Sequence, residues 1–454
     1  MSNLHTPATI TLTATALVAV GIHLLGCSGS SQPQNVAPSA IQPGTSGDGS
    51  NAVDVQTQRQ INELVQRVSE VRNLPVKFQI NGRVIDRPTM VRQLQEHIRT
   101  EVPSDAVAGE SAFLQSFGFV PLGFDYEAQT LKLMEAQIAG YYDPDAKTLF
   151  VMSDIGGAEA EIVLAHELIH ALQDQHFGVG SHLKYRENAG DAISAFSCLA
   201  EGDATSAQFD YMLSETGTRA VDVSDTQLRL MISSGIYLDP DVVSIPRIMK
   251  ESLVSPYVDG VIFVHSLRRQ GGWALVNEIW QNPPTTTEQV LHLDKLMSRE
   301  PAEVVEKPRT GPGAGFSAVY SEVYGEQDLR NALEEWMPKK AAAKAAAGWA
   351  GDRATVWQNR DLSVAIGAWQ IRFDHSGTDG TDEANEAFQL IAGAWDQIGK
   401  PAPCRPNGNG GHISLVRRGR DIVFVAGPKL PGNDASTSAC DLLSAWGLSI
   451  LADK

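Results

Sequence analysis

The sequence His166-Glu167-Leu168-Ile169-His170 lies inside a strongly apolar run, residues 158 to 175, and is flanked by Ile162 to Ala165 and by Ala171-Leu172. A glycine pair precedes the run, and apolar residues would occupy nearly every side of a helix built from it. Such a helix has to be buried, and buried polar groups are unfavourable unless they find partners. The fold must therefore bring partners to the two histidines and the glutamate.

The spacing of the two histidines indicates a metal ion as their partner. Residues four apart project from one face of a helix, so the imidazoles of His166 and His170 can reach one tetrahedral ion. Glu167 lies beside that face, where its carboxylate can take a proton from a water molecule. Zn²⁺ is the expected ion, because it suits imidazole and carboxylate ligands and hydrolysis needs no redox change. The competing interpretation is a pair of core histidines with ordinary hydrogen-bond partners.

The motif resembles that of the gluzincins, a group of zinc peptidases with thermolysin-like sites. That resemblance implies a third ligand, a glutamate on a later helix, and Glu201 fits it within a stretch of small and apolar residues, 199 to 205. The interval from the motif to Glu201 is longer than in thermolysin. The resemblance also implies a zincin-type catalytic domain that hydrolyses peptide bonds.

Longer stretches of the chain extend the resemblance. HELIHALQDQHF at 166–177, PTTTEQVLH at 284–292 and GWAGDR at 348–353 are similar to sequences of uncharacterised bacterial and archaeal proteins. The likeness covers most of residues 57 to 400 and implies no particular substrate.

Several residues are candidates for supporting roles around the metal. Asp203 and Asp174 could orient a ligand histidine by hydrogen bonding, with an exposed position as an equally good interpretation of Asp203. As a histidine does in thermolysin, His292 could donate to the developing oxyanion, and a capping or loop role is its alternative. Tyr257 and Tyr185 compete for the oxyanion role, and the sequence does not rank them.

A different histidine competes with Glu201 for the third ligand position. His176 lies ten residues after His166, the interval at which metzincins place their third histidine. In that group the helix ends at a glycine, whereas the matching residue here is Gln173, a good helix former. An unbroken helix carries His176 about 15 Å along the axis from His166, so Glu201 is preferred.

Apolar periodicity and turn signals predict an α+β fold. Residues 56–340 are expected to form a mostly helical catalytic domain with a small antiparallel sheet. One hairpin is expected at 76–86, turning on Asn81-Gly82, and another at 141–152. The resemblance to gluzincins implies an edge strand beside the motif helix that pairs with an extended substrate, and residues 147–152 lie where such a strand would be. Helices are expected near residues 61–71, 89–101, 158–175, 187–213 and 257–269.

The pattern changes after an Ala/Lys-rich stretch at residues 339–347. Strands at 362–373 and 413–426, with helices at 382–398 and 436–451, predict a small α+β accessory domain over residues 341–454. Cys404 and Cys440 lie in this region and form a plausible disulfide in an exported chain, whereas Cys198 lies in an apolar helical run and is expected to be a buried thiol.

The N-terminus carries signals for export and anchoring. Residues 8 to 25 are small and apolar, and they end in Leu24-Leu25-Gly26-Cys27, which resembles the lipobox of bacterial lipoproteins. That resemblance implies a signal peptide over residues 1–27, a lipid on Cys27 and a location on the bacterial cell envelope. Residues 28–55 are rich in Ser, Gly and Pro, which predicts a flexible linker. A signal peptide cut at another position is the alternative.

The net charge of −18, with no Lys/Arg block, argues against nucleic acid as a partner. We therefore expect an envelope-anchored zinc metallohydrolase, a peptidase that acts on peptides or proteins. One alternative is a non-catalytic scaffold stabilised by zinc, although a structural zinc site prefers four protein ligands and leaves Glu167 without a role. Another is a zinc hydrolase that acts on a non-peptide bond.

Overall fold

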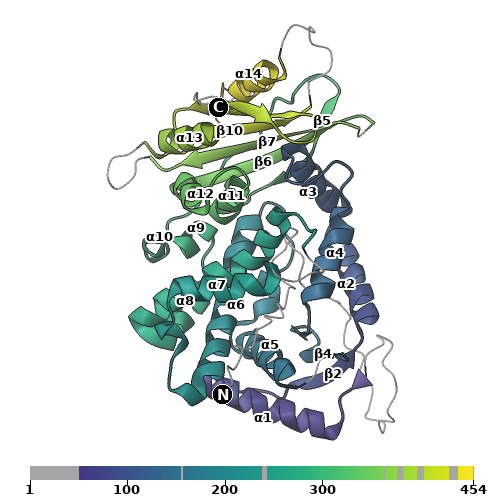
Figure 1. Ribbon diagram of the computed structural model, residues 1–454, viewed down its shortest axis with the longest axis vertical. Helices are drawn as coiled ribbons and strands as arrows, with labels where there is room; N and C mark the ends of the chain where they lie inside the picture. Colours follow the sequence, from purple (N-terminus) through teal and green to yellow (C-terminus); the bar gives the residue numbers. More distant parts are fainter. Residues whose placement is uncertain are drawn as a thin grey trace, which may run out of the picture.

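The computed structural model describes residues 51–154, 157–237, 243–361, 363–375, 382–395, 403–428 and 438–452. The fold is α+β: a helical body with a small sheet at one end, and a six-stranded sheet at the other (Figure 1). Cys27 and the linker up to residue 50 lie outside the described residues. Among the helices in the described ranges, none combines the length and the apolar character that a membrane crossing needs.

The helical body is built around two helices that pack face to face, α6 and α8. Gly202 and Gly260 meet at their contact, and a Cβ on Gly202 would lie 2.1 Å from the carbonyl carbon of Gly260. Only glycine permits so close an approach of two backbones. The body comprises α1 (Val55–Arg72), α2 (Arg87–Glu101), α3 (Ser104–Phe117), α4 (Tyr126–Gln137), α5 (Gly157–Phe177), α6 (Gly190–Leu213), α7 (Asp225–Tyr237), α8 (Arg247–Gln281), α9 (Thr287–Leu291) and α10 (Leu293–Ser298).

The small sheet packs beside α1 and α5, and its order is β1-β2-β4-β3. Its strands are β1 (Asn51–Ala52), β2 (Asn81–Ile85), β3 (Gly140–Asp143) and β4 (Thr148–Met152). The expected hairpin at 141–152 is confirmed, because β3 and β4 pair antiparallel. The sheet is mixed rather than antiparallel, since β2 and β4 run parallel. At its other edge β1 pairs with β2, so the last residues of the expected linker are part of the sheet.

The hairpin expected to turn on Asn81-Gly82 is wrong. Both residues lie inside β2, and residues 76–80 form no strand. A side chain of α1 holds this segment straight: Gln58 donates to the carbonyl of Ile80 at 2.9 Å and accepts from the amide of Gly82 at 2.9 Å. Gly82 is needed for packing rather than for a turn, because a Cβ there would lie 2.4 Å from the side chain of Ile61.

The second sheet forms the C-terminal region, in the order β5-β6-β7-β10-β9-β8. Apolar side chains of α3 and α13 (Glu383–Ala394) pack on one face and those of α14 (Ala439–Ala452) on the other. The disulfide Cys404–Cys440 is confirmed, and Cys198 is a buried free thiol. The strands are β5 (Phe316–Glu322), β6 (Trp349–Asn359), β7 (Ala365–Phe373), β8 (Cys404–Pro406), β9 (His412–Arg418) and β10 (Asp421–Gly427).

This sheet takes its first strand from residues before 341, where the accessory domain was expected to start. Phe316–Glu322 pairs with β6, and the helices α11 (Gly325–Leu333) and α12 (Lys339–Ala346) follow it. β5 and β6 were not expected from the sequence. β6 is buried on both faces along most of its length, so its residues show no alternation of apolar and polar side chains.

Residues 284–292 and 348–353 lie where the helical body meets this sheet. Asp352 accepts hydrogen bonds from the amides of Tyr324 and Gly325, at 3.0 and 2.9 Å. Asp191, at the start of α6, accepts from the amide of Thr287 at 2.8 Å. Gly325 lies between the two carboxylates at φ 80°, and a Cβ there would lie 1.8 Å from Asp191. The two segments thus meet at Gly325, where the helical body contacts the sheet.

Candidate metal centre

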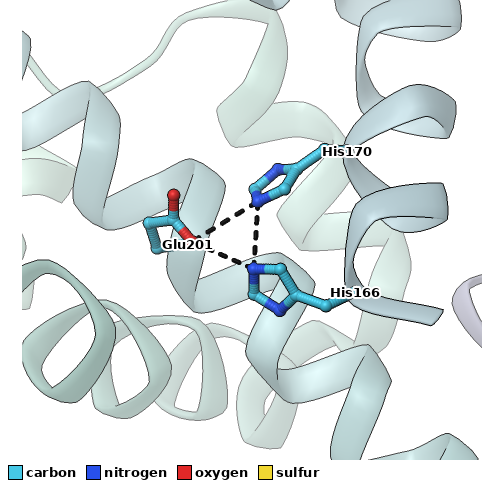
Figure 2. A group of neighbouring side chains, drawn as sticks. All are labelled: His166, His170 and Glu201. Atoms are coloured by element: carbon cyan, nitrogen blue, oxygen red, sulfur yellow. Dashed lines mark hydrogen bonds and ion pairs between the residues drawn. The ribbon is translucent and has the colours of Figure 1, made fainter. Parts of the chain in front are cut away.

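Helices α5 and α6 bring three side chains to one point. His166 and His170 project from α5 one turn apart, and Glu201 projects toward them from α6 (Figure 2). The Glu201 carboxylate oxygen Oε2 lies 3.1 Å from Nε2 of His166 and 3.4 Å from Nε2 of His170. The two Nε2 atoms are 3.0 Å apart. Each side chain thus offers one ligand atom, and all three lie within 4.8 Å of one another.

The chemistry of this group fits a cation. Glu201 is fully buried, and its second carboxylate oxygen, Oε1, has no hydrogen-bond partner. A buried carboxylate with an unsatisfied oxygen is unfavourable unless a positive charge compensates it. Against the effect of burial, the charge of Glu201 raises the pKa of His170 to about 9, so in this arrangement a proton supplies that charge. The buried group of His166, His170 and Glu201 can hold a metal ion in place of the proton.

Glu167 lies next to the first histidine and is fully buried. Its Oε2 accepts a hydrogen bond from the backbone amide of Tyr142 in β3, at 3.0 Å. Burial raises the pKa of Glu167 to about 8, and the charge of Glu201 adds to that effect. The carboxyl group can therefore exchange a proton near neutral pH, as a general base or acid must.

Tyr257 is the one of the three oxyanion candidates that the structure places at this group. Its ring centroid lies 6.1 Å from that of His166. Burial, with the charges of Glu201 and Glu167, raises the pKa of its phenol, which therefore stays protonated as a hydrogen-bond donor. Tyr185 instead lines a separate cavity of about 400 Å³ beside β5.

His292 does not take the oxyanion position expected for it. It caps the end of α9 and the start of α10, and its Nε2 pairs with Glu326 at 2.8 Å. Thr287, which lies in the same short segment as His292, is hydrogen-bonded to Asp191 in the first turn of α6. Glu201 lies ten residues after Asp191, which is about 15 Å further along that helix. The capping role, the alternative for His292, is the one the structure shows.

Neither aspartate expected to orient a ligand histidine does so. Asp203 is buried and accepts from Arg72 and Trp280, at 2.8 and 2.6 Å. Two residues along a helix are about 200° apart, so Asp203 and Glu201 project from different faces of α6. Asp174 accepts from the hydroxyl of Tyr142 at 3.1 Å and so connects α5 to β3.

The metzincin alternative fails on geometry. α5 continues without a break to Phe177, and Nε2 of His176 lies 2.7 Å from the carbonyl of Pro75. Glu201, the residue expected as the third ligand, is the one grouped with the two histidines.

The residue that orients His170 was missed in the sequence. Oε1 of Gln173 lies 2.8 Å from Nδ1 of His170, and its Nε2 donates to the carbonyl of Ala200 at 3.0 Å. The only available signal was the i, i+3 spacing from His170, which places both side chains on one face of α5. That spacing is also what ordinary helix packing produces, so it did not identify Gln173.

Comparison with known proteins extends to one part of the chain. Residues 315–436 match a family model described as a domain of unknown function, DUF8575. The matched range contains all six strands of the C-terminal sheet and none of the metal-binding group. No curated protein and no solved structure matches the chain. The C-terminal sheet is thus similar to a family whose function is not assigned.

Proposed function

We propose that this protein is a zinc-dependent hydrolase of the gluzincin type, and that its substrate is a peptide or protein. The observation that carries the proposal is the convergence of His166, His170 and Glu201 with Glu167 beside them. Two histidines and a carboxylate suit Zn²⁺, and three protein ligands leave a position open for substrate. A structural zinc site would need neither an open position for substrate nor a carboxyl group such as that of Glu167 beside the ligands.

Each side chain at the site has a role in hydrolysis. Bound Zn²⁺ would supply a Lewis acid for the substrate carbonyl and for water. Glu167 takes the proton from the attacking water and gives it to the leaving amine. The amide of Tyr142 holds the Glu167 carboxylate in one orientation. The hydroxyl of Tyr257 donates a hydrogen bond to the oxyanion, a role for which His292 was also a candidate.

A peptide substrate is favoured by the outer edge of the small sheet. β3, and not β4 as expected from the sequence, is the edge strand, and it packs against α5. The amide of Met152 donates to the carbonyl of Ala139, so the backbone groups of alternate residues, including Gly140, point away from β4. An extended peptide can pair with that edge beside Glu167.

Metal binding is the first test. Protein loaded with Zn²⁺ and freed of excess metal should contain about one zinc per chain, because the site offers three ligands. His170→Ala and Glu201→Ala should each lose the bound zinc in elemental analysis, since a two-ligand site binds weakly. His176→Ala is the matched control and should keep it. Stoichiometric zinc in the His170→Ala protein would contradict the assignment. Cleavage of a peptide mixture, abolished by a chelator and restored by zinc, would separate a peptidase from a scaffold.

We also propose that the protein is anchored to the cell envelope by a lipid on Cys27, on the strength of the Leu24-Leu25-Gly26-Cys27 sequence. Cells that express the protein should incorporate labelled fatty acid into it, and Cys27→Ser should abolish the label. Cys198→Ser is the control and should retain the label. An unlabelled wild-type protein would rule out the anchor without affecting the proposed hydrolysis.

A further inference from the structure

One buried side chain, Gln173, contacts both helices of the metal-binding group. Its Nε2 donates to the carbonyl of Ala200, the residue before Glu201, at 3.0 Å. A carbonyl can only accept, so this contact fixes which end of the amide carries oxygen. The oxygen therefore faces Nδ1 of His170, 2.8 Å away, and Nδ1 must be the donor. Nε2, the atom that faces Glu201, is then the nitrogen through which His170 would bind a metal.

A second glutamine makes the reverse connection between the same helices. Gln208 of α6 donates from its Nε2 to the carbonyl of Ile162 in α5, at 3.0 Å. Ile162 lies one helical turn before His166, so the Gln208 contact lies beside the first histidine of the group. The Gln173 contact lies beside the second histidine, His170. Two amides thus cross between α5 and α6 on either side of the metal-binding group.

We infer that Gln173 is a positioning residue, which presents Nε2 of His170 to the metal and sets the distance between that nitrogen and Glu201. The inference rests on the proposed metal site. Ligand histidines need a partner on the second ring nitrogen, because it fixes the tautomer and the orientation of the ring. Here the partner is a neutral amide rather than a carboxylate. It orients the ligand without adding a third negative charge to those of Glu201 and Glu167.

The test compares two glutamines of one helix. Gln173→Met keeps the volume of the side chain but removes both hydrogen bonds, and it should weaken Zn²⁺ binding about 10- to 100-fold. Gln175→Met is the matched control. Gln175 is also a buried amide of α5, but it bonds to the backbone of Lys77 and Phe78. That variant should bind Zn²⁺ as the wild type does. Affinity is measured by competition with a chromophoric chelator, on full-length protein.

A conservative variant separates ligand orientation from packing. Gln173→Glu keeps an acceptor for Nδ1 of His170 but loses the donor to Ala200, so it should recover most of the Zn²⁺ affinity. With Co²⁺ as the probe, the visible bands of the wild type should reappear in Gln173→Glu and be altered in Gln173→Met. Equal Zn²⁺ affinity of Gln173→Met and the wild type would overturn the inference, and so would an equal loss in Gln175→Met. A wild type that binds no metal would instead overturn the proposed function.

Discussion

Glu167→Gln is expected to lower the rate of peptide hydrolysis by about 10²- to 10⁴-fold while leaving zinc bound. Glutamine is close to glutamate in shape and can still accept the hydrogen bond from the amide of Tyr142. It cannot take a proton from water at neutral pH. The change therefore removes the base but neither a ligand nor the packing around it. The rate is measured on a peptide that the wild type cleaves, together with the zinc content of each protein.

The control for this prediction is a glutamate of the same helix. Glu161 has a side chain that is 49% exposed, and it pairs with Arg67 and Tyr211 rather than with the metal-binding group. Glu161→Gln should hydrolyse the peptide at the wild-type rate. If Glu167→Gln keeps full activity while His170→Ala is inactive, the metal site stands and another group is the base. A parallel loss of zinc in Glu167→Gln would mean that the substitution disturbs the ligands.

Asp203→Ala is expected to destabilise the fold by about 3–5 kcal/mol, because it leaves the charge of Arg72 buried without its partner. Both side chains are completely buried, and Asp203 also accepts from the indole of Trp280. Arg72 ends α1, so the pair connects that helix to α6. Denaturant unfolding in the presence of a chelator measures the loss apart from any effect on metal binding.

Two further proteins make this prediction specific. The double variant Arg72→Met, Asp203→Leu should recover part of the lost stability, because an apolar pair can replace a buried ion pair of similar volume. Asp222→Ala removes the acidic partner of the exposed pair Arg219–Asp222 and should change the stability little. A free energy of unfolding for Asp203→Ala equal to that of the wild type would show that the pair is not a major anchor of α6.

Much of the candidate site could be predicted because its parts are local. The i, i+4 spacing of His166 and His170 fixes their common face as soon as the segment is a helix, and the apolar residues around them predict that helix. Glu201 lies 35 residues after His166, and assigning it required knowledge of how α5 and α6 pack, which no local pattern contains. The resemblance to gluzincins supplied that step.

The errors have a common origin in contacts between distant segments. Asn81-Gly82 has the composition of a turn, but Gln58 bonds to the carbonyl of Ile80 and the amide of Gly82 and so keeps the backbone extended. The place of β4 between β2 and β3 is a property of strand order, which local periodicity does not contain. An aspartate so close to Glu201 in the sequence suits a supporting role at a metal site, yet the partners of Asp203, which are Arg72 and Trp280, come from other helices.

The contact between Glu167 and the amide of Tyr142 has a consequence for how such a hydrolase could diversify. Every residue except proline carries that amide, so the hydrogen bond to Glu167 does not depend on the kind of side chain at position 142. In the proposed hydrolase, substitutions at the half-buried residues of β3, Tyr141 and Asp143, would change the strand beside the base, and with it the substrate preference, while the amide of residue 142 still holds Glu167. In the proposed hydrolase, substrate selectivity would thus change independently of proton transfer, and only proline at position 142 would remove the hydrogen bond to Glu167.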